Sequence, residues 1–77
     1  MTDLKFNILQ ILKGEEGLTF LELKKQLEDK NIKFSWKELK LILIELEEKN
    51  LIEERHFKDG KVDYSLEPEG YKYLKIK

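Results

Sequence analysis

Few residues of the chain have side chains suited to catalysis. Cysteine is absent, and the single histidine is His56. Thiolate nucleophiles and thiolate metal sites are therefore excluded, and a metal site built on histidine would lack a second imidazole. The sequence also has no glycine-rich phosphate loop, and its carboxylates are scattered as they are on solvated helix faces. We expect no enzymatic activity, no metal site and no cofactor.

Cationic side chains gather in two short stretches, and these are suited to binding phosphate. Residues 33–40 contain three lysines and one carboxylate, and residues 55–61 contain one arginine, one histidine and two lysines against one aspartate. Such cations contact phosphates and position a protein on DNA without reading its sequence. The same lysines could serve solubility alone, because 40% of the chain is charged. The candidate DNA-binding residues, with the neighbours expected to share their surface, are Lys33, Ser35, Lys37, Lys40, Leu41, Ile44, Arg55, Lys58 and Lys61.

The surface expected to carry these cations also includes apolar side chains. If residues 35–50 form a helix, its outward stripe has no arginine, asparagine or glutamine for a bidentate contact with a base. Leu41 and Ile44 on this stripe have three interpretations: packing in the core of a slightly rotated helix, contact with thymine methyl groups, or contact with a protein partner. Trp36, at the start of the same helix, could anchor a partner, but an aromatic side chain at this spacing is more often part of the core, and we expect it there.

Helical periodicity and capping residues predict three helices in the first two thirds of the chain. Residues 3–13 carry apolar side chains at helical spacing and on more than one side, so we expect this helix to be covered on two sides. Thr19 with Glu22 forms a capping box that starts a second helix, and Ser35 with Glu38 forms another that starts the third.

A β-hairpin is predicted after Asn50, which can adopt the left-handed conformation that ends a helix. Residues 51–57 depart from the helical period, and residues 62–66 alternate between apolar and polar side chains. Pro68 then starts a short final helix.

The sequence Asp-Gly at 59–60 indicates where the hairpin turns. A two-residue loop there would place Phe57 opposite Val62 and Arg55 opposite Tyr64, as a cross-strand pair. One face of the hairpin would then carry Leu51, Phe57, Val62, Tyr64 and Leu66.

Three stretches of the chain resemble winged-helix regulators of the MarR and PadR type. Residues 46–52 (LEEKNLI) resemble the LEEKGLI phrase that joins the recognition helix to the wing in those families, with Asn50 in place of glycine. Residues 64–70 (YSLEPEG) are similar to the Y-x-L-T-P-E-G phrase that follows the wing, and residues 19–23 are similar to the F-x-E-L opening of the helix-turn-helix.

The resemblance covers roughly residues 4–74 and implies an α+β fold, a winged helix-turn-helix, which we expect to form one domain over residues 1–77. The fold would have a three-helix core, an antiparallel wing of two or three strands and a short C-terminal helix. It also implies a transcriptional regulator that docks its third helix in the major groove of double-stranded DNA and its wing on the backbone. The alternative is a winged-helix module that binds a protein through an apolar patch, formed by Leu41 and Ile44 or by Phe6 and Leu9.

Net charge limits the DNA-binding hypothesis to a local surface. The formal net charge is −1, whereas dedicated nucleic-acid binders usually have a basic surplus. The abundance of lysine and glutamate is typical of proteins from hot environments, although an AT-rich genome also favours lysine.

Relatives of the MarR and PadR type pair through additional helices, so we expect a homodimer. Only the first helix and the last segment are available for this role, and the candidate interface residues are Phe6, Leu9, Tyr71 and Leu74. The first residues show no secretory signal and no apolar run approaches the length of a membrane span, so we expect a cytoplasmic protein.

Overall fold

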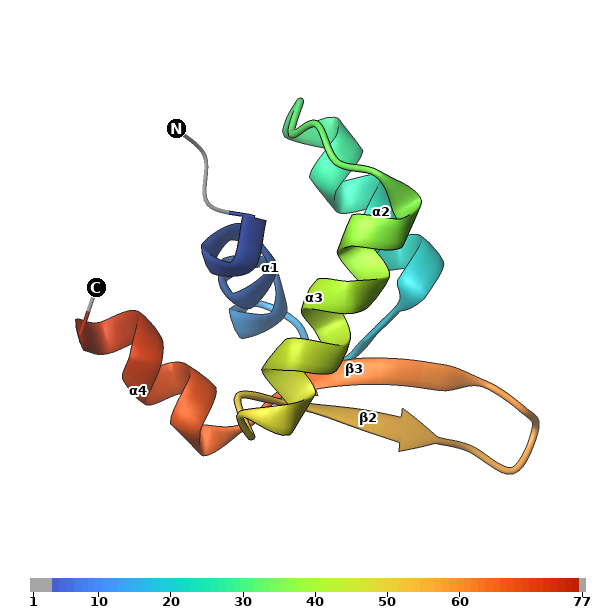
Figure 1. Ribbon diagram of the computed structural model, residues 1–77. Coiled ribbons are helices and arrows are strands. Elements are labelled where there is room, and N and C mark those ends of the chain that lie inside the picture. The colour runs from blue at the N-terminus through green and yellow to red at the C-terminus, as the bar shows by residue number, and fades with distance from the viewer. Residues whose placement is uncertain (1–3, 77) are drawn as a thin grey trace.

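The computed structural model describes residues 4–76, which form four helices and an antiparallel three-stranded sheet of order β1-β3-β2. The wing is the β2–β3 hairpin, which extends from the helices (Figure 1). The predicted α+β winged helix-turn-helix and the order of its elements are confirmed. The elements are α1 (Leu4–Lys13), β1 (Leu18–Thr19), α2 (Phe20–Asp29), α3 (Trp36–Glu48), β2 (Ile52–His56), β3 (Val62–Leu66) and α4 (Pro68–Ile76).

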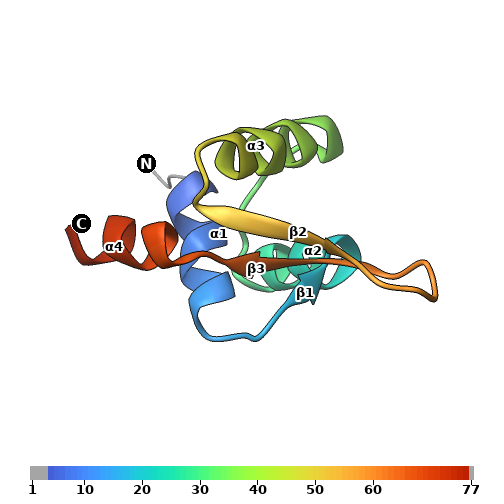
Figure 2. The ribbon, with the colours of Figure 1, turned by 90° about the horizontal axis from the view of Figure 1, so that it is seen from below.

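The core is a mainly aliphatic cluster to which every element contributes. Helix α1 packs against α2, β3 and α4, as expected for a helix with apolar residues on more than one side (Figure 2). Its residues Ile8, Leu9 and Leu12 are fully buried as a result. None of the helices within residues 4–76 is long and apolar enough to cross a membrane.

Both predicted capping boxes are present. The Thr19 hydroxyl accepts a hydrogen bond from the Glu22 N–H (3.2 Å), and the Glu22 carboxylate accepts one from the Thr19 N–H (2.9 Å). Ser35 and Glu38 make the same exchange at 3.0 and 3.4 Å. These bonds satisfy N–H groups that have no partner within the helix, so they define where α2 and α3 begin. Asn50 has φ 61°, as expected for a residue that ends a helix in the left-handed conformation.

The predicted register of the hairpin is wrong by one residue. The Gly60 N–H bonds to the Phe57 carbonyl (3.0 Å), and the Phe57 N–H bonds to the Lys61 carbonyl (2.8 Å). The loop therefore has three residues, 58–60, and Gly60 takes the positive φ (90°) that the last position of this turn requires.

This shift changes which side chains face each other. Arg55 lies opposite Asp63, and Glu54 lies opposite Tyr64. A slip of one residue exchanges the two faces of one strand. Phe57 is therefore exposed and does not share the buried face of Tyr64, contrary to the prediction.

Candidate nucleic-acid interface

The outward stripe of α3 is the one expected from the sequence. Leu39, Leu43 and Leu46 are buried, which orients the helix and directs its other side to solvent. Leu41 is 63% exposed and Ile44 is 47% exposed, so the interpretation that these two residues pack in the core is wrong. The exposed stripe of α3 consists of Lys37, Lys40, Leu41, Ile44 and Glu48.

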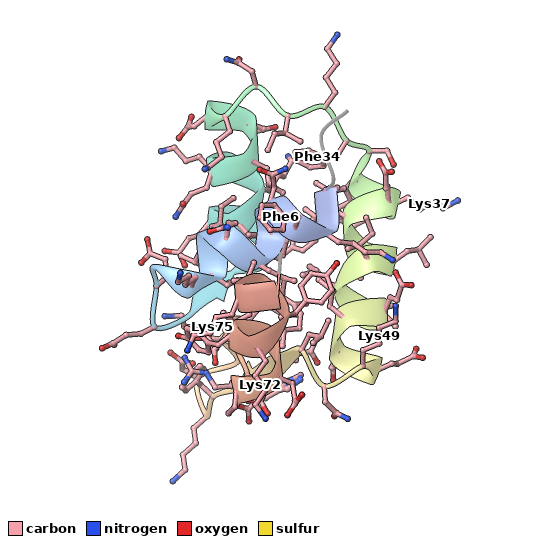
Figure 3. All side chains as sticks on the ribbon, turned by 90° about the vertical axis from the view of Figure 1, so that its left-hand side faces the viewer. Phe6, Phe34, Lys37, Lys49, Lys72 and Lys75 are labelled. Atoms are coloured by element: carbon pink, nitrogen blue, oxygen red, sulfur yellow. The ribbon has the colours of Figure 1, made fainter. Side chains whose placement is uncertain are left out.

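The first half of α3 and the residues just before it expose cations that are not paired with a described carboxylate. Within residues 4–76, no carboxylate lies in ion-pair distance of Lys33, Lys37 or Lys40. Figure 3 shows Lys37 extending away from the helix into solvent. The nearest acidic residue in the sequence, Glu38, turns its carboxylate back to the Ser35 N–H as part of the capping box. This end of the helix therefore presents positive charge.

Trp36 lies in the first turn of α3 and is 58% exposed, so its predicted place in the core is wrong. Its ring contacts Phe20 of α2 edge-on, with centroids 5.7 Å apart. The Lys40 ammonium lies 5.4 Å from the Trp36 ring, a cation–π distance. The side chains of a helix lean toward its N-terminus. Because Trp36 lies in the first turn of α3, its side chain can extend past the residues that cover the rest of the helix.

The C-terminal half of α3 is acidic. Glu45 pairs with Lys5 (2.8 Å) and Lys49 (3.5 Å), and the hydrogen bond from Lys5 is the main reason that its pKa lies below the usual value. Glu47 and Glu48 are exposed. Charge therefore changes sign along the helix, from lysines at its start to glutamates at its end.

The wing tip adds a second group of cations. Lys58 and Lys61 are exposed on either side of Asp59, whose carboxylate accepts a hydrogen bond from the Lys61 N–H (3.0 Å). The Lys61 ammonium lies 5.9 Å from the ring of the exposed Phe57. The wing tip and the N-terminal end of α3 lie toward the same side of the molecule in Figures 1 and 2. Both groups of lysines thus lie on the right-hand side of Figure 1, the start of α3 higher in the view and the wing tip lower.

Arg55 occupies a different position from the one expected of a DNA contact. Its Nε and Nη2 donate to the two carboxylate oxygens of Asp63 (2.8 and 2.9 Å), and Nη2 also donates to the Glu16 carbonyl (3.3 Å). These hydrogen bonds hold the pKa of the buried Asp63 below its usual value and raise the pKa of Arg55. Because its donors are used within the fold, we assign Arg55 to the structure of the wing. The sequence interpretation missed Asp63, which a three-residue loop would have placed opposite Arg55.

The predicted pair of Arg55 and Tyr64 does not form. The Tyr64 hydroxyl donates to the Glu54 carboxylate (3.2 Å). Burial, together with the negative charge of Glu54, raises the pKa of Tyr64 to about 12. The phenol therefore stays neutral at physiological pH and acts as a structural hydrogen-bond donor.

The four candidate dimer residues lie on α1 and α4, at the opposite end from the wing tip (Figure 1). Tyr71 is exposed and Phe6 is partly buried. Leu9 is fully buried and Leu74 nearly so, because both pack in the core of the protein itself. Leu9 therefore offers no surface to a second copy, and that part of the prediction is corrected.

No family model matches the chain, and no curated protein matches it in sequence. Solved structures do resemble it. RosR from H. salinarum has a TM-score of 0.83 and 28% identity, over 99% of this chain and 69% of that one. The ferric uptake regulator (Fur) of Vibrio cholerae, a protein with DNA-binding domains, has a TM-score of 0.71 and 22% identity, over 86% of this chain and 53% of that one. The chain thus spans about half of the Fur chain.

Proposed function

We propose that the chain is a DNA-binding protein that acts as a transcriptional regulator. The N-terminal half of α3 enters the major groove, where Lys37 and Lys40 contact phosphates or base edges. The wing tip contacts the flanking backbone through Lys58 and Lys61. The observation that carries this proposal is the group of exposed lysines at the start of α3 that no described carboxylate neutralises.

Two further observations support the proposal. The chain resembles Fur, whose structure includes DNA-binding domains. The two groups of lysines also lie on the same side of the molecule, so one duplex could contact both. A closer relation to the MarR and PadR regulators is part of the proposal and rests on the phrases at residues 46–52 and 64–70.

The test is a titration against random-sequence duplex DNA at several salt concentrations. Each phosphate that a lysine neutralises releases condensed counterions, so the logarithm of the affinity should fall with the logarithm of the salt concentration by about 0.9 per phosphate. Binding that does not respond to salt, or no binding at low salt, would reject the proposal. Trp36, the only tryptophan of the chain, lies at the proposed interface, and its fluorescence can report binding without a label.

A double substitution tests the docking mode. Lys37→Ala with Lys40→Ala should weaken binding to every duplex and reduce the salt slope by about two. The matched control is Lys72→Ala with Lys75→Ala, which removes two exposed lysines from α4 at the other end of the protein. If the control reduces the slope equally, α3 does not dock as proposed.

The second candidate function is a protein-interaction module, and the exposure of Leu41 and Ile44 favours it. Exposed apolar patches often mark interfaces with other proteins. Such binding would bury aliphatic surface and would change little between low and high salt. The salt titration therefore separates the two functions.

We also propose that two copies pair through α1 and α4, with Phe6 and Tyr71 as the accessible residues. This arrangement would leave both wings free for DNA, because α1 and α4 lie away from the wing tip. Sedimentation that shows a monomer at hundreds of micromolar would contradict the dimer.

A further inference from the structure

The middle of the exposed stripe of α3 is apolar. Leu41 and Ile44 lie one turn apart and are among the most exposed aliphatic side chains of the described residues. Lys37 and Lys40 precede them on the same stripe. If α3 docks as proposed, the side chains that follow the lysines on the stripe and face the base edges are those of Leu41 and Ile44.

The chemistry of the major groove leaves one partner for these side chains. Most groups on the base edges there are hydrogen-bond donors or acceptors, and an aliphatic side chain cannot pair with them. The exception is the C5-methyl group of thymine, which accepts apolar contact. Among the described residues, the outward stripe contains no asparagine, glutamine or arginine that would read adenine or guanine by a bidentate contact.

The dimensions agree with this assignment. Lys37 and Ile44 are seven residues apart, which is about 10 Å along a helix. The major groove is about 12 Å wide. A helix that crosses the groove can therefore keep its lysines at the phosphate wall while Leu41 and Ile44 lie over the bases.

Charge favours DNA over an apolar protein groove as the occupant of this surface. The Lys40 ammonium is adjacent in sequence to Leu41 and lies within cation–π distance of Trp36. Covering Leu41 with an apolar partner would take this cation out of water, at a cost in free energy. A duplex would instead pair the cation with a phosphate.

We infer that Leu41 and Ile44 read thymine methyl groups and that the preferred DNA sites of this protein carry thymines opposite the middle of α3. The inference rests on the proposed DNA-binding function and adds its sequence preference. It assigns phosphate contact to the lysines and base discrimination to the aliphatic pair.

The test uses deoxyuridine, which differs from thymidine only by the missing C5-methyl group. Preferred duplexes are selected from a random pool with the wild-type protein, and each thymine is then replaced in turn by deoxyuridine. One or two replacements should weaken binding by about fourfold each, the value expected for the loss of one buried methyl group. Replacements elsewhere should have no effect.

Two variants assign the effect to residues. Leu41→Ala with Ile44→Ala should bring the ratio of thymine to deoxyuridine affinity close to one, while the salt slope stays that of the wild type because the lysines remain. Both positions are exposed, and a thermal melt checks that the variant folds. Lys37→Ala with Lys40→Ala should weaken binding to both duplexes equally and leave the ratio unchanged.

The outcomes separate this inference from the proposed function. Salt-dependent DNA binding without any effect of deoxyuridine, or without any enriched sequence, overturns the inference alone. The inference is also overturned if the Leu41→Ala, Ile44→Ala variant still prefers thymine over deoxyuridine as strongly as the wild type does, because other residues would then read the methyl groups. No binding to any duplex at low salt rejects the DNA-binding function and the inference with it.

Discussion

The ion pair between Arg55 and Asp63 joins the two strands of the wing and connects them to a segment that is distant in the sequence. It links β2 to β3, and Arg55 also donates to the Glu16 carbonyl in the turn after α1. Gly17 lies against the pair so closely that a Cβ at this position would collide with the Arg55 guanidinium and the Asp63 carboxylate. The ion pair therefore connects the wing to the turn after α1, and its close approach to that turn requires a residue without a side chain at position 17.

Asp63→Asn is expected to destabilise the protein in a pH-dependent way. The pKa of Asp63 in the folded state lies below its ordinary value of 3.8, mainly because of the hydrogen bonds from Arg55. Its contribution to stability is therefore present above about pH 4 and is lost as the pH falls through the lowered pKa. Urea unfolding should show a loss of roughly 1–3 kcal/mol at pH 7 and a smaller difference from the wild type at pH 3.

Asp59→Asn is the matched control for that experiment. Asp59 is exposed at the wing tip, and an asparagine can still accept the hydrogen bond from the Lys61 N–H. Its effect should stay within about 0.5 kcal/mol at both pH values. If Asp63→Asn lowers the free energy of unfolding equally at pH 7 and pH 3, the charge of the carboxylate is not what stabilises the wing.

The sequence indicated some residue roles and missed others. Capping boxes depend on residues three positions apart, so Thr19 and Ser35 could be identified from the sequence alone. The Arg55–Asp63 pair depends on the length of the hairpin loop, and a glycine at position 60 is compatible with loops of two or three residues. The exposure of Trp36 depends on how α2 and α3 pack together, which is a tertiary property.

At the scale of elements, the start of α3 depends on its cap. The Ser35 hydroxyl bonds to the Glu38 N–H (3.0 Å), so Ser35→Ala should lower the free energy of unfolding by about 1 kcal/mol. For a domain of this size the melting temperature should fall by roughly 4–8 °C. Ser35→Asp, which also caps a helix well, should retain most of the stability in the same melt. An alanine variant as stable as the wild type would contradict the role of the cap.

The position of α4 against the sheet depends on the close approach of Gly70 to Leu51 and Leu66. A Cβ at Gly70 would overlap the Leu51 carbonyl and the Leu66 side chain. The carbonyl belongs to the backbone and accepts a hydrogen bond from the Glu67 N–H (3.0 Å), so it cannot easily move. Gly70→Ala should therefore displace α4 and cost roughly 1–3 kcal/mol in a denaturant titration.

Gly14→Ala serves as the control for Gly70. The nearest atom to a Cβ at Gly14, outside its own neighbours, is the Ile11 carbonyl oxygen at 3.9 Å, an ordinary contact. This variant should be neutral or stabilised by up to about 1 kcal/mol, because alanine restricts the unfolded chain. Equal losses at the two glycines would indicate a general effect of alanine and not a collision at α4.

On the scale of the whole molecule, a net charge of −1 conceals a separation of charge. Lysines gather at the start of α3 and on the wing tip, and glutamates gather at the end of α3. Periodicity predicted the outward stripe along which this separation runs. The sequence could not show that the wing tip and the start of α3 lie on the same side of the molecule, because the two groups of lysines are about twenty residues apart in the chain. Only the fold brings them to that side. A near-neutral protein can therefore present two groups of cations on one side.

The acidic end of α3 should limit binding to DNA of any sequence. Glu48 lies on the same exposed stripe as Lys37, so its carboxylate would approach the phosphates when the helix docks. Glu48→Gln should strengthen binding to random duplexes at low salt by about two- to fivefold, because one charge at close range contributes no more than about 1 kcal/mol in water. The gain should disappear at 1 M salt, where the Debye length is only about 3 Å.

The control is Glu69→Gln on α4, at the end away from the wing tip, which should leave the affinity unchanged. An equal gain from both variants would mean that net charge, and not the position of Glu48 on the docking face, sets the affinity.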